Sequence, residues 1–478
     1  MDQSRRSGLG RERFLRLSAA AGGSAVLAGL PRSASATVPL HCAPPTPPGP
    51  PTPWAGDSRA IQTRPSAYAL SAAYLTKLQS AYAAMRALPA TDGRSFRAQA
   101  NIHGWWCGGC GDGMMAPGGG IHYKWTFFLW HRAYLYFHEK ILGKLIGDPT
   151  FRLPYWDWDN PAHLVMPSGF TTPGSSSNSL YNGTRALGAS TPLPAAGVNA
   201  ATMSAIFALT GWDPFGGNPG SGGAVENQPH GYVHVMVGGD MGAFSTAAQD
   251  PIFYAHHCNV DRVWAHWKDD LTPARPNPPP GYFGSTAWPF YDENKNWVSI
   301  KPSDVLDHTA QLRYNYTGGL VLHTPFPHFT IGPLHTFRPF PLRTAPVIYQ
   351  QLPPFTIPGP DPVFRVLPEQ RSKVLASARA GQRIAIGFQN ITIPQGVSGI
   401  IDIRSDGQVI GYLAIVPDSP DGTSMHPIHA SAVVEVTAVA ERMFAANAAP
   451  KLTLSAQVGG RQFAPVPLRA AQAHIVAF

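Results

Sequence analysis

Residues 122–139 read HYKWTFFLWHRAYLYFHE, and the interpretation of the whole chain starts from this stretch. It holds three histidines and eight other aromatic residues in eighteen positions. Its apolar periodicity predicts a helix over residues 123–146 that lies in the protein core. Imidazoles in so apolar a helix need partners, and the positions of the other histidines indicate which partner to expect.

Further histidines precede and follow this helix. His103 lies ahead of it, and His122 and His131 flank its start. His230 and His234 are four residues apart, which places both imidazoles on one face of a helix at a spacing suited to one metal ion.

Two more histidines are adjacent, at positions 256 and 257. On an amphipathic helix they point about 100° apart, so only one of them is expected to join the same site. The apolar positions Phe253 and Trp264 favour His257 as the inward residue. Asp261 lies four residues after His257 on the same face.

Six imidazoles therefore form two sets of three, one before residue 140 and one after residue 229. Neutral imidazole is a good ligand for zinc, copper, iron or nickel. Because hydrolytic zinc sites and iron sites usually include a carboxylate, two all-histidine triads favour copper. Any one of these residues could be a core histidine that is hydrogen-bonded within the protein. That interpretation accounts poorly for six histidines in this arrangement.

Composition narrows the remaining options. The chain has 478 residues, 44% of them hydrophobic and only 13% charged, with 49 prolines and 48 glycines. This composition permits a large core with long loops. The net charge of +8 is spread along the chain, without a basic block interleaved with aromatics, so nucleic-acid binding is not expected.

The N-terminus is interpreted as a targeting segment over residues 1–36. A basic region is followed by an apolar run and by the small residues Ala34-Ser35-Ala36, typical of a cleavage site. RERFLR resembles the twin-arginine export motif, with Glu12 in place of the second arginine, and Arg5-Arg6 is the other candidate pair. An ordinary secretion signal is the alternative. We expect a mature chain from Thr37, exported to the periplasm or the cell exterior and not membrane-bound.

The sequence predicts two domains. Helices are expected at 65–90, 123–146 and 250–268, with long loops at 160–222. Prolines are dense from 322 to 363, and we assign residues 37–335 to a mainly helical domain and 336–363 to a linker. Residues 364–478 alternate apolar and polar positions between DG and GG turns, which predicts a C-terminal antiparallel β-sandwich.

Several blocks of the chain resemble the type-3 copper proteins, the tyrosinase and catechol oxidase family, and in particular plant-type polyphenol oxidases. The similarity runs in unbroken order over about residues 60–320 and is weak beyond. The blocks are TRPSAYAL, QANIHGWWC, HYKWTFFLWHRAYLYFHEKIL, LPYWDWD, QPHGYVHVMVGGDMGAF, DPIFYAHHCNVDRVW and PFYDENKNWVSIKPSDVLDHTAQLRYNYTG.

The resemblance implies a four-helix bundle around two copper ions. One ion would be held by His103, His122 and His131. The other would be held by His230, His234 and His257. Tyr314 and Tyr316 would close the catalytic domain near Arg64.

The resemblance also implies a thioether between Cys107 and His122. A disulfide from Cys107 to Cys110 or Cys42 is the alternative. With the thioether present, Cys42 and Cys110 remain as a candidate disulfide. Gly104 stands where plant relatives have a disulfide cysteine, so the disulfide pattern departs from theirs.

The implied activity is oxidation of catechols to o-quinones by O2. Asp261 would orient a ligand imidazole, and Phe244 would be the bulky residue over the second copper. Glu226 would hold a water that acts as a base toward a phenol O–H. Gly231 and Val235 follow the first two ligands of that copper, and Gly231 offers no side-chain acceptor, which predicts weak or no monophenol hydroxylation.

Other interpretations stay open at this point. A tyrosinase with full monophenolase activity and an o-aminophenol oxidase share the same site, and a haemocyanin-like O2 carrier is the non-enzyme alternative. The partners expected are a phenolic small molecule and O2, with no obligatory protein partner. The C-terminal domain is expected to shield the site in a latent precursor, with the proline-rich residues 336–362 as a cleavable tether. A permanently attached domain without that role is the alternative.

Overall fold

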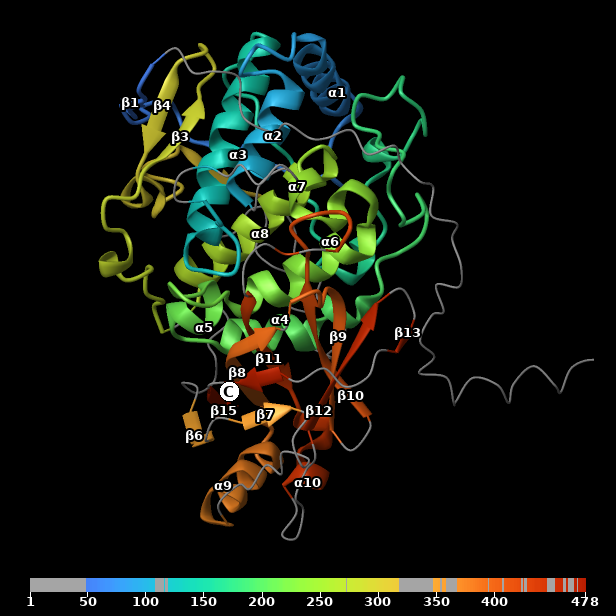
Figure 1. Cartoon of the computed structure of the whole chain (residues 1–478), viewed down its shortest axis with the longest axis vertical. Coiled ribbons are helices and arrows are strands. Elements are labelled where there is room, and N and C mark those ends of the chain that lie inside the picture. Colours follow the sequence, from blue (N-terminus) through green and yellow to red (C-terminus); the bar gives the residue numbers. More distant parts are fainter. Residues whose placement is uncertain are drawn as a thin grey trace, which may run out of the picture.

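The computed structural model describes residues 49–317, except 108–115, 117–118 and 272, and much of 347–478. The gaps in the second range are 353–354, 358–367, 394, 406–407, 423, 425–427, 445–451, 459–460, 463–467 and 471. Figure 1 shows a helical part and, below it, a part rich in strands. The expected targeting segment lies outside the described residues.

The helical part confirms the three predicted helices, which are α1, α3 and α8. Helix α1 begins at residue 72 because the side chain of Ser71 accepts the N–H of Tyr74 at 3.2 Å. No described helix is long and apolar enough to cross a membrane. The helices are α1 (Ala72–Ala87), α2 (Phe96–Cys107), α3 (Thr126–Leu145), α4 (Ala200–Ala208), α5 (Trp212–Gly216), α6 (Gly231–Val237), α7 (Phe244–Ala247) and α8 (Ile252–Asp269), with a π-helical turn η4 (Glu226–His230) before α6.

Helix α3 is buried along almost its whole length, which explains its aromatic composition. Trp130 and Tyr134 are 0% exposed. The helix packs against α8, where the guanidinium carbon of Arg132 lies 3.4 Å from the ring centroid of Trp264. Each large apolar side chain buried here contributes about 1.5–3 kcal/mol, so this helix pair anchors the histidines in a rigid core.

Two small sheets complete the helical part. Strands β2 (Gln62–Arg64) and β5 (Tyr314–Tyr316) pair in parallel, and the guanidinium carbon of Arg64 lies 3.6 Å from the ring centroid of Tyr314. This confirms the expected contact between that tyrosine pair and Arg64. The second sheet has the order β1-β4-β3, from β1 (Thr52–Pro53), β3 (Trp288–Tyr291) and β4 (Trp297–Ile300).

The region 160–222, predicted as long loops, also contains helices α4 and α5. Asn199 starts α4 by accepting the N–H of Thr202 at 2.9 Å, a cap that glycine- and proline-rich surroundings concealed. The short helical turns of this part are η1 (Pro161–His163), η2 (Ser168–Phe170), η3 (Ala195–Gly197), η5 (Gly239–Gly242), η6 (Pro280–Tyr282) and η7 (Pro302–Val305).

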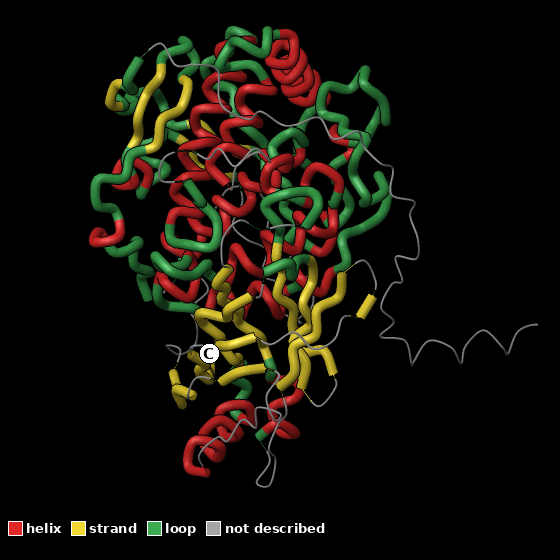
Figure 2. The backbone as a smooth tube through the Cα atoms, in the orientation of Figure 1, coloured by secondary structure: helices red, strands yellow, loops and turns green. Residues whose placement is uncertain are grey.

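The C-terminal part has two sheets. One has the order β10-β9-β12-β13, and the other β6-β15-β8-β14-β7 with β11 paired to β8. Figure 2 shows these strands gathered against one side of the helical part. The elements are β6 (Val347–Leu352), β7 (Phe355–Ile357), α9 (Pro368–Arg379), β8 (Ile384–Ile393), β9 (Gly399–Ser405), β10 (Gln408–Ile415), β11 (Ile428–Glu435), η8 (Thr437–Val439), α10 (Ala440–Met443), β12 (Leu452–Val458), β13 (Arg461–Gln462), β14 (Leu468–Ala470) and β15 (Gln472–Ala477).

One hydrophobic cluster is shared by both sheets. It includes Ile386 of β8 and Val434 of β11, together with Ile403 of β9 and Leu413 of β10. All four are at most 2% exposed. The period-two pattern of the sequence therefore corresponds to inward-facing strand residues.

Part of the predicted linker is not a linker. Residues 347–352 and 355–357 form β6 and β7, which pair with β15 and β14. Both are edge strands of their sheet, and edges are where nearby prolines are tolerated. The high proline content of this stretch therefore concealed two strands, and residues 336–346 lie outside the described part.

Candidate metal centre

The six histidines predicted as ligands lie together in the helical core. His103 comes from α2, His131 from α3 and His257 from α8. His122 lies four residues before the start of α3, while the last two, His230 and His234, come from η4 and α6. None of the six is more than 7% exposed, so the centre is closed off from bulk solvent.

The first three histidines converge. The Nε2 atoms of His103 and His131 are 3.3 Å apart. The ring centroid of His122 lies 5.4 Å from that of His103 and 5.0 Å from that of His131. Such spacing suits three ligands around one ion.

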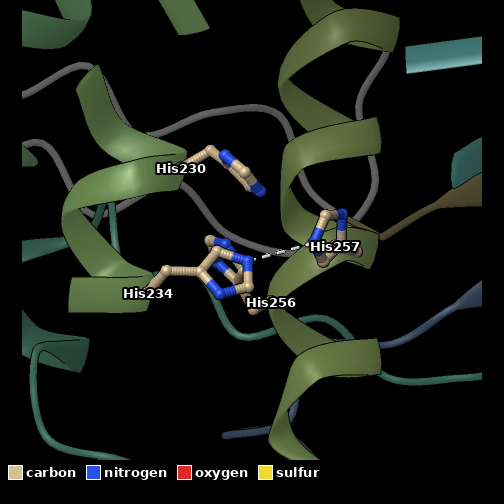
Figure 3. Close-up of side chains that lie close together, drawn as sticks. All are labelled: His230, His234, His256 and His257. Atoms are coloured by element: carbon tan, nitrogen blue, oxygen red, sulfur yellow. Dashed lines mark hydrogen bonds between the residues drawn. The ribbon is translucent and has the colours of Figure 1, made fainter. Parts of the chain in front are cut away.

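The other three converge in the same way, with a fourth histidine beside them. Donor atoms of His230, His234, His256 and His257 all lie within 4.8 Å of one another. The Nε2 atoms of His234 and His257 are 3.2 Å apart, and Figure 3 shows the four rings pointing toward a common space from two helices.

The two groups adjoin to form one centre. The rings of His131 and His257 stack with centroids 4.2 Å apart and planes 13° apart. The centroids of His122 and His230 are 6.1 Å apart. A pair of ions held by the two groups would therefore be close neighbours.

The presence of His256 in the second group corrects the expectation that only one of the adjacent histidines would join it. Its Nδ1 accepts the indole N–H of Trp158 at 2.9 Å, and its ring lies 5.3 Å from that of His230. Among the ring contacts of the described residues, His257 alone of this pair also reaches the first triad, through His131 and His103. The helical rotation of 100° still lets both rings reach a site at the helix surface.

Backbone carbonyls orient most of the imidazoles. Nδ1 of His103 bonds to the carbonyl of Phe244 at 2.9 Å, and Nδ1 of His234 bonds to the carbonyl of Met241 at 2.7 Å. His131 and His230 bond in the same way to the carbonyls four residues before them, at 2.8 and 3.1 Å. A proton held on Nδ1 leaves Nε2 as the metal-binding atom.

The predicted role of Asp261 in orienting a ligand imidazole is wrong. Its Oδ1 accepts from Nε of Arg132 at 2.6 Å, and its Oδ2 from the phenol of Tyr314 at 2.5 Å. Arg64 and Tyr316 also bond to Oδ2. The carboxylate therefore pairs with Arg132 and shares Arg64 with Glu139, and it joins α8 to α3, β2 and β5. The i, i+4 spacing from His257 was misleading because the carboxylate faces arginine and tyrosine side chains, and Nδ1 of His257 has no partner.

Burial keeps the imidazoles neutral. It lowers the pKa of His131 to about 3 and that of His234 to about 4. His122 has no partner on either nitrogen, and neither Nε2 of His230 nor Nδ1 of His257 has one. Buried polar atoms without partners are costly, and a set of neutral nitrogens facing one space fits copper ions as the missing partners.

The cysteines divide into two described and two outside the described residues. Cys107 is buried and unpaired, and its Sγ lies 3.3 Å from Nε2 of His103 and within 4.8 Å of a donor nitrogen of His122. Its thioether to His122 stays a prediction. Cys258 is a buried thiol whose pKa is raised by burial. The Cys42–Cys110 disulfide involves residues outside the described part.

Phe244 and Glu226 both lie at the centre. The rings of Phe244 and His122 stack with centroids 3.5 Å apart and planes 8° apart. Oε1 of Glu226 accepts the backbone N–H of Tyr123 at 2.7 Å, while its buried Oε2 has no partner. Burial raises the pKa of this carboxyl well above its usual value.

The two residues that follow His230 and His234 differ in their surroundings. A Cβ built on Gly231 would lie 3.0 Å from the carbonyl oxygen of Ala414 and 3.2 Å from its Cβ. Val235 is half-buried against the hydrophobic core. Gly231 thus marks a close approach of the C-terminal part to the centre.

Residues 414–418, which we call the cover segment, contact this side of the centre. The phenol of Tyr123 donates to the carbonyl of Val416 at 2.8 Å and accepts its N–H at 2.9 Å. The N–H of Phe244 donates to the carbonyl of Pro417 at 2.9 Å, and that of Ser245 to the carbonyl of Asp418 at 2.9 Å.

Strand β11 makes a second set of contacts through the edge that faces away from β8. His429 accepts the N–H of Gly222 at 2.8 Å, and Ser431 donates its N–H to the side chain of Asn227 at 3.0 Å. Gln228 pairs with both the N–H and the carbonyl of Val433, at 2.8 and 2.9 Å. The alternate residues of the strand therefore dock on η4, which also carries Glu226 and His230.

A cavity of about 200 Å³ lies between the two parts beside His122. The helical part contributes Cys107 and Lys124 to its lining, and the C-terminal part contributes Asp418 and Ile428. Sequence reasoning missed Tyr123, Asn227 and Gln228. Their only signal was position beside predicted ligands, because their partners lie some two hundred residues or more away.

Family models match the region that holds this centre. The common central domain of tyrosinase matches residues 93–205 and 193–270. The polyphenol oxidase middle domain matches residues 285–321.

Individual proteins match more widely. A latent-form chloroplastic polyphenol oxidase of Prunus armeniaca is 38% identical over 292 residues, 54% of this chain and 48% of the relative. The crystal structure of Grenache (Vitis vinifera) polyphenol oxidase is 34% identical, covering 61% of this chain and 95% of that chain with a TM-score of 0.52. A latent aurone synthase (polyphenol oxidase) is 25% identical, covering 91% and 93% with a TM-score of 0.66. The chain spans about half the length of the curated relatives it matches.

Proposed function

The chain belongs to the tyrosinase family, among the plant-type polyphenol and catechol oxidases, and we therefore propose that it oxidises o-diphenols to o-quinones with O2. The observation that carries this proposal is the pair of adjoining histidine groups, buried and neutral, with unpartnered nitrogens facing one space. The proposal assigns to this chain the activity that the names of its relatives state for those proteins.

Two copper ions are the cofactor of this centre. His103, His122 and His131 would hold one ion, and His230, His234 and His257 the other. When bound, the copper pair supplies O2 binding and accepts the electrons that the phenol gives up. The helices and carbonyls supply the rest, because they hold each imidazole in one orientation within a dry site.

The role proposed for Phe244 is to shape the approach to the centre. Its ring already stacks on His122, so an incoming aromatic ring would pack edge-on or offset against it. The surrounding aromatic residues exclude water and thereby protect a reactive quinone from side reactions.

We propose that Glu226 handles the phenol proton, with Oε2 as the accepting atom, directly or through a water. The carboxyl is buried and already bonded to Tyr123 through Oε1, so Oε2 is the atom left to accept. Gly231 offers no side chain to hold such a water beside it. Diphenol oxidation with weak or no monophenol hydroxylation follows, and full tyrosinase activity is the alternative outcome.

The C-terminal part is proposed to shield the centre until it is displaced. The cover segment bonds to Tyr123, Phe244 and Ser245, which border the centre. Two relatives that match this chain carry the word latent in their names. The sequence predicted a cleavable tether over residues 336–362, but residues 347–352 and 355–357 are paired strands, so cleavage between residues 318 and 346 is the proposed route of activation.

Residues 1–36 are proposed to direct the chain to its compartment. Curated relatives are named chloroplastic, which supports a targeting segment of some kind. The twin-arginine-like export route stays a prediction. Fusing residues 1–36 to a reporter that is active only when exported folded would test it, with an Arg5-Arg6 to Lys-Lys variant as control.

The test of the activity is oxygen uptake by the copper-loaded chain from Thr37, on a catechol and on its monophenol. The intact chain is compared with one cleaved at a site inserted within 318–346. Uptake on catechol that increases after cleavage is expected. Equal rates on both substrates would indicate a tyrosinase, faster uptake on a matched o-aminophenol an aminophenol oxidase, and reversible O2 binding without turnover a carrier.

A further inference from the structure

Tyr123, which follows the predicted ligand His122, has an unusual backbone conformation. Its φ angle is +57°, in the left-handed region that residues other than glycine rarely adopt. Asparagine tolerates this region far better than tyrosine does, and β-branched residues tolerate it least. Contacts of Tyr123 with its surroundings must therefore hold it there.

The first contact joins the backbone of Tyr123 to Glu226. Its N–H donates to Oε1 at 2.7 Å, and a short bond to a carboxylate is among the stronger kinds of hydrogen bond. The direction of this N–H depends on the backbone dihedral angles, so the left-handed conformation aims the N–H at the carboxylate. Bonding of Oε1 in turn fixes where Oε2 points.

The second contact joins the side chain of Tyr123 to the cover segment. Its phenol oxygen bonds to both the N–H and the carbonyl of Val416. The ring centroid also lies 5.8 Å from that of Phe244. One residue therefore touches the shielding part through its side chain and Glu226 through its backbone.

Gly222 shows how closely these groups pack. A Cβ at this position would lie 2.8 Å from Oε2 of Glu226 and 3.0 Å from the Cα of Tyr123. Its own N–H donates to the carbonyl of His429 in β11. A side chain at this position would therefore collide with both Tyr123 and Glu226, so the packing here requires glycine.

We propose that Tyr123 is a positioning residue that couples docking of the cover segment to the orientation of Glu226. The inference rests on the proposed role of Glu226 in the reaction, but the coupling itself does not require turnover. Docking favours the left-handed conformation that aims the Tyr123 N–H, and the Tyr123–Glu226 bond favours docking. Such coupling is reciprocal, so a change at Glu226 must alter docking although Glu226 does not touch Val416.

The coupling is tested by hydrogen exchange of the peptide that contains Val416, in the full chain with and without copper. Tyr123→Phe removes the acceptor of the Val416 N–H, and we expect exchange there to accelerate about fivefold or more. Glu226→Ala is expected to accelerate the same peptide, whereas Glu226→Gln, which retains an acceptor oxygen, restores slow exchange. Gln228→Ala, which loosens docking directly at Val433, is the positive control.

The outcomes separate coupling from simple anchoring. If Glu226→Ala leaves exchange at Val416 unchanged while Tyr123→Phe accelerates it, Tyr123 is an anchor only and the coupling is overturned. If Tyr123→Phe has no effect either, the phenol contact does not hold the cover segment. Exchange in the copper-free chain requires no catalysis, so these results stand even if the proposed activity fails.

Positioning is tested by comparing Tyr123→Asn with Tyr123→Val in the cleaved, copper-loaded chain. Both lack the phenol, but asparagine accepts a left-handed backbone and valine resists it. We expect kcat/KM for a catechol to be about tenfold or more higher for the asparagine variant, with an acid limb of the pH profile shifted only in the valine variant. Equal values and equal pH profiles in folded variants would contradict a positioning role.

Discussion

Gln228→Ala is predicted to activate the intact chain without cleavage. Gln228 is 4% exposed and docks the C-terminal part on η4 through three hydrogen bonds, two to Val433 of β11 and one to the carbonyl of Tyr412 in β10 at 3.3 Å. Each bond contributes about 1 kcal/mol net, and the longest contributes least, so the loss is about 2–3 kcal/mol of docking free energy. That corresponds to a change of about 30- to 150-fold in the ratio of docked to undocked chains.

The assay is oxygen uptake on a catechol before and after cleavage between 318 and 346. Uptake by the intact variant should increase by up to that factor, and should not exceed the rate of the cleaved chain. Gln311→Ala is the matched control, because that amide also bonds to two backbone groups, but those belong to Asp307 and Ser303 of the helical part. An intact Gln228→Ala chain that stays as inactive as the parent, with both forms activated equally by cleavage, would refute docking through η4.

Four further predictions follow from the same contacts. His257→Ala should bind one copper per chain, whereas His256→Ala should still bind two, which metal analysis of folded protein decides; one copper in both variants would make His256 a ligand. Asp261→Asn should destabilise the chain by about 3–5 kcal/mol in urea unfolding, since it leaves Arg132 buried without its carboxylate while Arg64 keeps only its pair with Glu139, but should keep two coppers. In the folded chain the pKa of His131 is about 3 and that of His234 about 4, both below the value in the unfolded chain. The copper-free chain should therefore lose stability as the pH falls from about 6.5 to about 4. A urea midpoint that stays constant over that range would contradict the burial of these imidazoles. Gly231→Asn should raise oxygen uptake by the intact chain, because its side chain would meet Ala414, and an unchanged latent rate would show that the cover segment lies elsewhere in solution.

The sequence predicted the centre better than it predicted the surroundings of the centre. Helical spacing located His230 and His234, because that signal is local. The choice of His257 over His256 by amphipathicity stays a prediction, since both rings lie in the second group. The role of Asp261 could not be read in the same way. Its partners Arg132 and Tyr314 are 129 and 53 residues away, and no local pattern distinguishes a carboxylate facing an imidazole from one facing a guanidinium.

The same limit applies to the C-terminal part. Period-two alternation identified its strands, but the prolines that flank β6 and β7 in the sequence made both strands look like linker. The docking of Val416 on Tyr123 spans 293 residues, and a tyrosine in a left-handed conformation leaves no mark in the sequence. Contacts of this kind depend on the packing of two domains, which periodicity does not encode.

The most direct test of the central claim is the stoichiometry of catechol oxidation by the cleaved chain loaded with two coppers. Oxygen consumed and o-quinone formed are measured together, for the parent and for His257→Ala. The proposed function predicts two quinones for each O2, with O2 reduced to water, and no turnover by the variant that holds one copper. Oxygen uptake without quinone, or full activity in a chain with a single copper, would contradict a dicopper catechol oxidase.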